Sequence, residues 1–178
     1  MSSEREEIVR KYLDENGIAY SCYHHPAGAT IAEASLYWRK DGSLHCKNLF
    51  FRNHKGNRHY LVCFPAEMDL PIHDLEHLLK QGKLSFASPE RMLRYLGLEP
   101  GSVSPFGLIN DCENHVHLFM DKQLHEAPSL SFHPNDCRGT IVIDQANFQH
   151  YLQIIGNSHT YLDFSTLSDE DLHSVKNK

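Results

Sequence analysis

A lysine stands inside an otherwise apolar stretch near the middle of the chain. In "HCKNLFFRN", residues 45–53, Lys47 and Asn48 are followed at once by three apolar residues. Alternate side chains of a strand face opposite ways, so Lys47 would share a face with Leu49 and Phe51. An ammonium group among apolar side chains needs an anionic partner, a shifted pKa or a ligand. An edge-strand lysine whose head reaches water fits the same residues, and the segment alone leaves both interpretations open.

A second candidate is the histidine in "SFHPND", residues 131–136. Proline disfavours the helical region for the residue before it, so His133 is expected in extended backbone, with a turn following at Asn135 and Asp136. Such a loop can present a histidine as an acid, a base or a hydrogen-bond donor. The chain has 14 histidines, and an ordinary exposed turn is the alternative.

The loop "GSVSP", residues 101–105, is a third candidate. Its exposed backbone N–H groups suit an anion or a developing oxyanion. It lacks the lysine spacing of a P-loop, and the chain has no GxGxxG motif. A plain connection between a helix and a strand fits this loop equally well.

Basic residues gather around the predicted hairpin that follows Lys47. Asp41 is the one acidic residue among them, so the cluster is either a solvated hairpin or a rim that contacts phosphates. Its members are Arg39, Lys40, Lys47, Arg52, Lys55 and Arg58.

Composition limits the class of protein. The 178 residues suit one domain, and a net charge of −6 with a pI near 6.1 argues against a strongly basic nucleic-acid coat. The N-terminus lacks the apolar core of a signal peptide, and no run approaches the ~20 apolar residues of a membrane span. The five scattered cysteines include no CxxC pair, so we expect reduced thiols and a cytoplasmic protein.

Metal binding is not expected from spacing. The close histidine pairs are "HH" (24–25) and "HVH" (115–117), and neither has a zinc-type partner at the usual distance along the chain. Cys46 adjoins Lys47, but strand alternation turns it to the opposite face, so we expect a packing cysteine. No GxSxG nucleophile elbow is present.

Periodicity and capping signals predict helices and strands in mixed order. Ser3, Thr30, Asp69, Ser88 and Asp144 are the expected N-caps. The predicted helices cover 3–16, 30–38, 69–82, 89–96 and 144–156, and the predicted strands cover 18–24, 44–52, 58–64, 106–110, 115–120 and 139–143. This is not a steady βαβ alternation, so we expect an α/β (α+β) fold with a mixed, mostly antiparallel, curved sheet surrounded by helices. Residues 1–163 form the expected domain, and 164–178 form a polar, flexible tail.

Taken together, three segments resemble the YbaK/ProX family of aminoacyl-tRNA editing domains, also called the prolyl-tRNA synthetase-associated domain. The segments are "CKNLFFRNHKGNRHYLV", "KLSFASPERMLRYLGLEPGSVSPFGLIND" and "FHPND…GTIVI". The resemblance spans about residues 5–156 and is nearest to the free-standing branch that removes alanine from mischarged tRNA(Pro). It implies the family's fold, with a curved sheet or partial barrel.

The resemblance also implies a set of site residues. Lys47 matches the essential lysine and His133 the histidine of the FHP-type loop, so these two are the expected catalytic residues. The expected substrate-binding residues are Asn48, His25, Pro26, Thr30, Gly101, Ser102, Ser104, Pro105 and Phe132. Arg52, Lys55 and Arg58 are the expected rim that contacts tRNA. Relatives often carry bulkier residues at the positions of Gly28 and Ala29, which bears on which amino acid is removed.

The function implied is hydrolysis of mischarged Ala-tRNA(Pro) in trans. A synthetase pocket built for proline discriminates against a smaller side chain by only ~1–3 kcal/mol per methylene, so a second, size-excluding site removes the error. Lys47 would meet a phosphate or the oxyanion, and His133 would donate a hydrogen bond. The partners would be the acceptor end of tRNA(Pro) and prolyl-tRNA synthetase, with no cofactor, metal or membrane. Cys-tRNA(Pro), Ser-tRNA, a non-catalytic module that binds tRNA or a synthetase, and a structural or regulatory domain with a solvated Lys47 are the alternatives.

Overall fold

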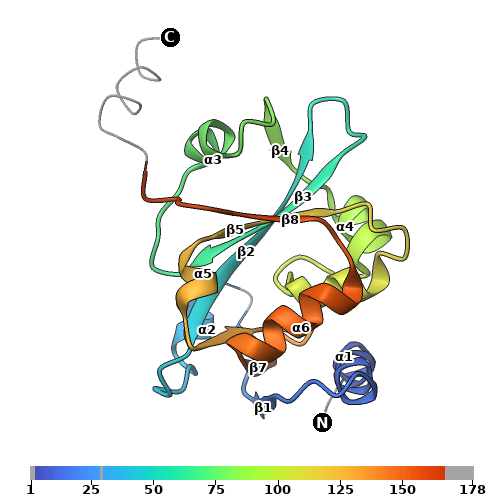
Figure 1. Ribbon diagram of the computed structural model, residues 1–178, viewed down its shortest axis with the longest axis vertical. Helices are drawn as coiled ribbons and strands as arrows, with labels where there is room; N and C mark the ends of the chain where they lie inside the picture. The colour runs from blue at the N-terminus through green and yellow to red at the C-terminus, as the bar shows by residue number, and fades with distance from the viewer. Residues whose placement is uncertain (1–2, 29, 167–178) are drawn as a thin grey trace.

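The computed structural model describes residues 3–28 and 30–166, which form a curved sheet with helices on both faces (Figure 1). The 8-stranded sheet has the order β1-β7-β6-β2-β3-β5-β8, and β4 pairs with β2. The strands are β1 (Ser21–His24), β2 (Leu44–Asn53), β3 (His59–Pro65), β4 (Leu84–Phe86), β5 (His117–Asp121), β6 (Ser129–Phe132), β7 (Gly139–Asp144) and β8 (His159–Leu162). Antiparallel pairs join β1–β7, β2–β3, β2–β4 and β6–β7, and parallel pairs join β2–β6, β3–β5 and β5–β8. The expected mixed sheet is therefore confirmed.

Short helices connect and cover the strands. They are α1 (Glu4–Glu15), α2 (Ile31–Ser35), α3 (Ile72–Leu79), α4 (Pro89–Leu96), the 3₁₀ helix η1 (Pro105–Asn110), α5 (Gln123–Glu126) and α6 (Gln145–Ile155). Four of the predicted N-caps are confirmed by side-chain oxygens that accept a backbone N–H, namely those of Ser3, Thr30, Ser88 and Asp144. No helix in the described ranges is both long and apolar enough to cross a membrane.

Several predicted elements differ from the structure for local reasons. Asp69 does not cap α3: Pro71 occupies the N-cap position, and the helix ends at Leu79, followed by Lys80 as C-cap with a left-handed φ of 54°. Residues 106–110 form η1 rather than a strand, because Ser104 Oγ accepts the Phe106 N–H and starts a turn. The helix beginning at Ile31 ends at Ser35 rather than at Trp38.

The shortest strands of the sheet differ most from the prediction. The first strand starts at Ser21 rather than Ile18, because the Ala19 N–H is taken by the Asn147 side chain. Three short strands, β4, β6 and β8, and the short helix α5 were not predicted. Strands of three or four residues carry too few alternations for periodicity to register.

Two apolar clusters pack against opposite faces of the central strands. One cluster joins Phe50 and Leu61 to α1, α4, α6 and η1, and the other joins Phe51 and Val62 to α3, β4 and Phe164. Alternation along β2 and β3 supplies side chains to both clusters, and every residue of β3 is buried. Phe164 is 1% exposed, one residue beyond the expected end of the domain at 163. The expected tail is otherwise mostly outside the described residues, so its flexibility stays a prediction.

Candidate active site

A cavity of about 460 Å³ opens beside the middle of β2. Its walls come from β2, the start of α2, the β4–α4 connection, the loop before η1 and the loop after β6. Five sequence-predicted site residues line it: Thr30, Lys47, Asn48, Gly101 and His133. Segments far apart in the sequence therefore supply one shared space.

Lys47 is the cationic side chain of the cavity. It sits in the antiparallel ladder opposite Phe64 and is partly buried. It forms no ion pair with any residue in 3–28 or 30–166, and no Asp or Glu occurs among the described residues that line the cavity. An ammonium group in a partly apolar cavity with no anionic partner is poised for an anionic ligand.

Asn48 contributes a second polar group to the same space. Its Oδ1 is buried and lacks a hydrogen-bond partner among the described residues. A buried carbonyl oxygen without a partner costs about 1–3 kcal/mol, and such groups in native structures call for an explanation.

The parallel pairing of β2 with β6 explains how His133 reaches Lys47. In that register His45 is opposite Ser131. Continuing that register by two residues brings His133, the first residue after β6, beside Lys47, which is still inside β2. His133 lines the cavity, as the shared register requires.

The hydrogen bond of His133 fixes its tautomer. Nδ1 lies 3.0 Å from the Gly139 carbonyl oxygen, which can only accept, so Nδ1 carries the proton. Burial lowers the pKa of His133 below its ordinary value, which favours the neutral ring at neutral pH. Nε2 is then a lone-pair acceptor rather than the donor expected from the sequence.

The loop 101–105 contributes backbone more than side chains. Pro100, Gly101 and Val103 line the cavity, and Gly101 has a left-handed φ of 88°. Ser104 is fully buried and caps η1, while the Pro105 carbonyl accepts the Tyr151 hydroxyl at 2.7 Å. Ser102, Ser104 and Pro105 are thus not among the residues that line the cavity.

The other expected contacts lie around the cavity. His25 donates to the Pro26 carbonyl and bonds Thr140 Oγ1 at 2.9 Å, so both ring nitrogens have partners. Neither His25 nor Pro26 lines the cavity. Phe132 belongs to a small adjoining cavity that shares Asn48 and His133 with the larger one.

Gly28 is confined by the start of α2. A Cβ at this position would lie 2.7 Å from the Ala34 Cα, so no larger side chain fits without moving the helix. Gly28 lines the cavity, so this part of the cavity wall consists of backbone atoms. Ala29, the other position where the family resemblance implies bulkier residues in relatives, lies outside the described residues.

The basic rim lies further along β2 than the cavity. Arg52 is five residues from Lys47, or about 16 Å along an extended strand, and Lys55 and Arg58 flank the hairpin turn. All three are partly or fully exposed. A ligand that reaches both places must therefore be as long as a nucleic-acid end.

Sequence reasoning missed the apolar walls of the cavity. Phe86 lines it while remaining 60% exposed, and its ring lies 4.8 Å from that of Phe51. Ile31, Met92 and Val103 complete the apolar lining. An exposed phenylalanine on a three-residue strand has no periodic signal, so only the fold reveals it.

A larger cavity of about 1040 Å³ lies on the outer face of β3, β5 and β8. Here the histidines already have partners: both nitrogens of His117 contact hydroxyls of Ser158 and Thr160, and both nitrogens of His59 contact Arg91 and His115. By volume alone, this groove would be the preferred candidate for the functional site. The unpartnered Lys47 and Asn48 groups favour the smaller cavity as the site of chemistry.

Comparison with known proteins gives the family. The model of the aminoacyl-tRNA editing domain matches residues 25–151. The chain is 34% identical over 158 residues to "Prolyl-tRNA editing protein ProX" of Acetoanaerobium sticklandii, covering 89% of this chain and 96% of that protein.

More distant relatives agree with this match. The "Prolyl-tRNA synthetase associated domain-containing protein 1" of Xenopus laevis is 27% identical over 92% of this chain and 99% of its own length. A crystal structure described as a candidate trans-editing enzyme for prolyl tRNA synthetase superposes with a TM-score of 0.67 at 21% identity, covering 92% of this chain and 99% of that one. At that identity the likeness shows the fold. The chain belongs to the YbaK/ProX family of aminoacyl-tRNA editing domains.

Proposed function

We propose that this protein is a trans-acting deacylase that hydrolyses the ester of mischarged Ala-tRNA(Pro). Family membership supports aminoacyl-tRNA editing. The observation that carries the proposal is the Lys47 ammonium group, without an ion-pair partner among the described residues, in a cavity that Asn48 and His133 also line.

The reaction needs little covalent help from the protein. A water oxygen attacks the ester carbonyl carbon, the bond to the ribose oxygen breaks, and the water's proton passes to that oxygen. The products are the free amino acid and tRNA with a free terminal hydroxyl. Lys47 stabilises the negative charge, either on the oxyanion or on a phosphate of the acceptor end, without moving during the reaction.

His133 has the role of an orienting acceptor in this scheme. Its neutral Nε2 accepts a hydrogen bond from the attacking water or from the neighbouring ribose hydroxyl of the tRNA. No carboxylate among the described lining residues is available as a base, so the ribose hydroxyl is the expected proton relay.

The apolar walls favour a small apolar side chain on the substrate. Ile31, Met92 and Val103 offer no hydrogen bond to a serine hydroxyl, whereas an alanine methyl group loses nothing by entering. The partly exposed Arg52 and the exposed Lys55 and Arg58 are proposed to contact phosphates of the acceptor stem. A complex with prolyl-tRNA synthetase stays a prediction of the family resemblance.

The test is a deacylation panel with Ala-tRNA(Pro), Pro-tRNA(Pro), Cys-tRNA(Pro) and Ser-tRNA, using wild type and Lys47→Ala. We expect selective loss of alanine that depends on Lys47, with Pro-tRNA(Pro) left intact. Preference for cysteine or serine would move the substrate and keep the mechanism. Binding of tRNA without turnover of any ester would overturn the proposal in favour of a non-catalytic module.

A further inference from the structure

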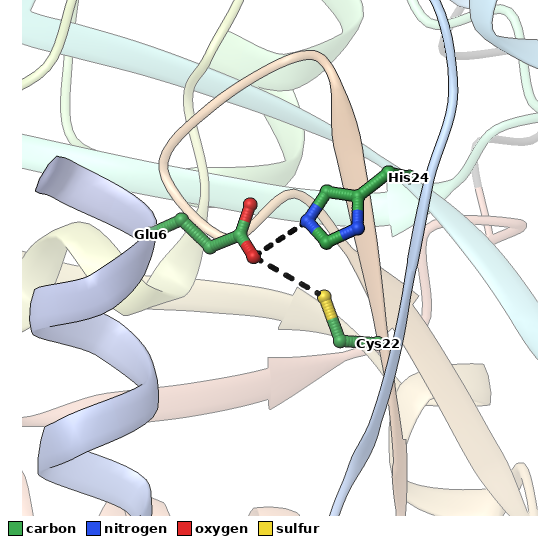
Figure 2. A group of neighbouring side chains, drawn as sticks. All are labelled: Glu6, Cys22 and His24. Carbon is green, nitrogen blue, oxygen red and sulfur yellow. Dashed lines mark hydrogen bonds and ion pairs between the residues drawn. The ribbon is translucent and has the colours of Figure 1, made fainter. Parts of the chain in front are cut away.

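A second cluster of chemistry-bearing side chains lies where α1 meets the edge strand β1, outside the Lys47 cavity. Figure 2 shows the Glu6 carboxylate pointing from α1 toward His24 and Cys22, which project from β1. Glu6 Oε1 lies 2.7 Å from His24 Nε2 and 3.7 Å from Cys22 Sγ. One ligand atom from each of the three residues falls within 4.8 Å of the others.

The side chain of Glu6 has an unusual orientation and burial for a residue in the first turn of a helix. Its sequence spacing from Ser3 suggests a capping box, in which the glutamate side chain turns back to the cap. Its N–H does bond Ser3 Oγ, but its carboxylate turns instead to His24, and the side chain is 2% exposed. A carboxylate is almost never buried to this degree unless it is paired or holds a metal.

The three potential ligand atoms are of the types that bind Zn²⁺. A thiolate, an imidazole nitrogen and a carboxylate oxygen are the ligand types of Zn²⁺, and three protein ligands with one open position form a common zinc arrangement. Without a metal, the His24 N–H and the Cys22 S–H both point at the same carboxylate oxygen. A single cation at their meeting point replaces those two hydrogen bonds with three coordinate bonds.

Neighbouring charges leave room for such a cation. Arg10 approaches Glu6 Oε1 at 3.6 Å, too far for a strong hydrogen bond, and its 44% exposed side chain has a second partner in Tyr20, away from Glu6. Arg138 is held by two close contacts with Asp136. With Cys22 deprotonated, the site would carry two negative charges, which a divalent ion balances.

We propose that Glu6, Cys22 and His24 form a binding site for one Zn²⁺ ion that ties α1 to the edge strand β1. The ligands are separated by 16 and 18 positions along the chain from Glu6, so the site exists only in the folded protein. Metal that binds only the folded state stabilises it.

Titration with Co²⁺, a spectroscopic substitute for Zn²⁺, tests the proposal on protein freed of metal and kept reduced. We expect one equivalent to give a thiolate-to-cobalt charge-transfer band and the strong visible bands of a tetrahedral site, which Zn²⁺ then removes because it binds more tightly. Cys22→Ser should abolish the charge-transfer band, and His24→Ala should weaken binding at least about 10-fold.

Matched controls separate this site from the other thiols and imidazoles of the chain. Cys112→Ser and His125→Ala change an exposed cysteine and an exposed histidine elsewhere, and both should titrate like wild type. A charge-transfer band that survives Cys22→Ser, or that disappears with Cys112→Ser, overturns the proposal. So does the absence of any band, which would leave a hydrogen-bonded trio that only neutralises Glu6.

Thermal unfolding gives a second, independent readout. At a Zn²⁺ concentration 100 times Kd, the folding equilibrium of wild type should shift about 100-fold toward the folded state. The same addition should leave the melting temperature of Cys22→Ser unchanged. Equal stabilisation of both proteins would place the metal elsewhere and contradict the site.

Discussion

The Lys47 cavity and the histidine groove on the outer face of β3, β5 and β8 differ in how their polar groups are satisfied. In the groove, both ring nitrogens of His59 and both of His117 contact hydrogen-bonding partners within the protein. In the cavity wall, Lys47 has no anionic partner in the described ranges, and Asn48 Oδ1 accepts no hydrogen bond from them. The polar groups of the groove are thus satisfied within the fold, whereas Lys47 remains without an ion-pair partner in the described ranges, which is why we propose the smaller cavity as the active site.

The largest expected effect comes from removing the cation of the cavity. Lys47→Ala should lower kcat/KM for deacylation about 10²–10³-fold, the range seen when one charge-stabilising group is lost. Its melting temperature should stay near that of wild type, because the amine has no protein partner to lose. Lys11→Ala, on the exposed side of α1, is the control and should retain full activity. Near-wild-type turnover by Lys47→Ala would show that the reaction does not take place in the Lys47 cavity.

The next prediction compares His133 of the cavity with His117 of the groove. His133→Ala should lower kcat/KM about 10²-fold, since it removes the Nε2 acceptor. His117→Ala should leave turnover within about twofold and lower the melting temperature by about 2–4 °C for each kcal/mol lost with its hydrogen bonds. If His117→Ala impaired turnover as strongly as His133→Ala, the division between the two regions would fail.

The pH dependence of turnover sharpens the role given to His133. Because burial lowers its pKa, the neutral acceptor persists below the ordinary histidine range. Turnover should therefore hold through about pH 6.5 and fall only on further acidification, as Nε2 takes a proton. A rise in kcat/KM on acidification would show that the protonated ring, a donor, is the active form.

In the groove, acid should affect stability instead of turnover. Burial, with help from His115 and Arg91, lowers the pKa of His59 from 6.5 to about 4. Between those values the unfolded chain binds the proton and the folded one does not, so the unfolding free energy falls as pH drops from 6.5 to about 4. The loss should reach up to about 3 kcal/mol.

The variant His59→Gln isolates that contribution. Urea unfolding at about pH 7 and about pH 4.5 should show a smaller loss of unfolding free energy on acidification in the variant than in wild type. Parallel losses in both proteins would mean that carboxylates elsewhere account for the acid sensitivity and that His59 does not.

The smallest effect belongs to the exposed basic rim. Single changes Arg52→Ala, Lys55→Ala and Arg58→Ala should each raise KM a few-fold and reduce the salt dependence of tRNA binding by about one unit of slope. Turnover at saturating tRNA should not change. Salt slopes equal to that of wild type would mean that the tRNA leaves the cavity in another direction.

Much of the fold could be predicted because its signals are local. Ser3, Ser88 and Asp144 cap their helices as their spacing predicts, and the hairpin of β2 and β3 follows from two apolar runs around Gly56. Elements of three or four residues, such as β4 and β8, escaped prediction because pairing with neighbouring strands, not their own sequence, defines them.

By itself, the sequence determined the residue types of the site and the family to which they point, since Lys47, Asn48, Gly101 and His133 lie in short contiguous motifs. Only the tertiary structure decided which of them share a cavity, because that depends on the parallel register of β2 and β6. It also set the tautomer of His133 through the Gly139 carbonyl and turned Ser104 and His25 to other partners. The same holds for Glu6, Cys22 and His24, whose spacing gives no metal motif and whose meeting requires α1 to pack on β1. Hydrogen-bond partners and metal ligands act over a few ångströms in space, and distance along the chain does not measure that separation.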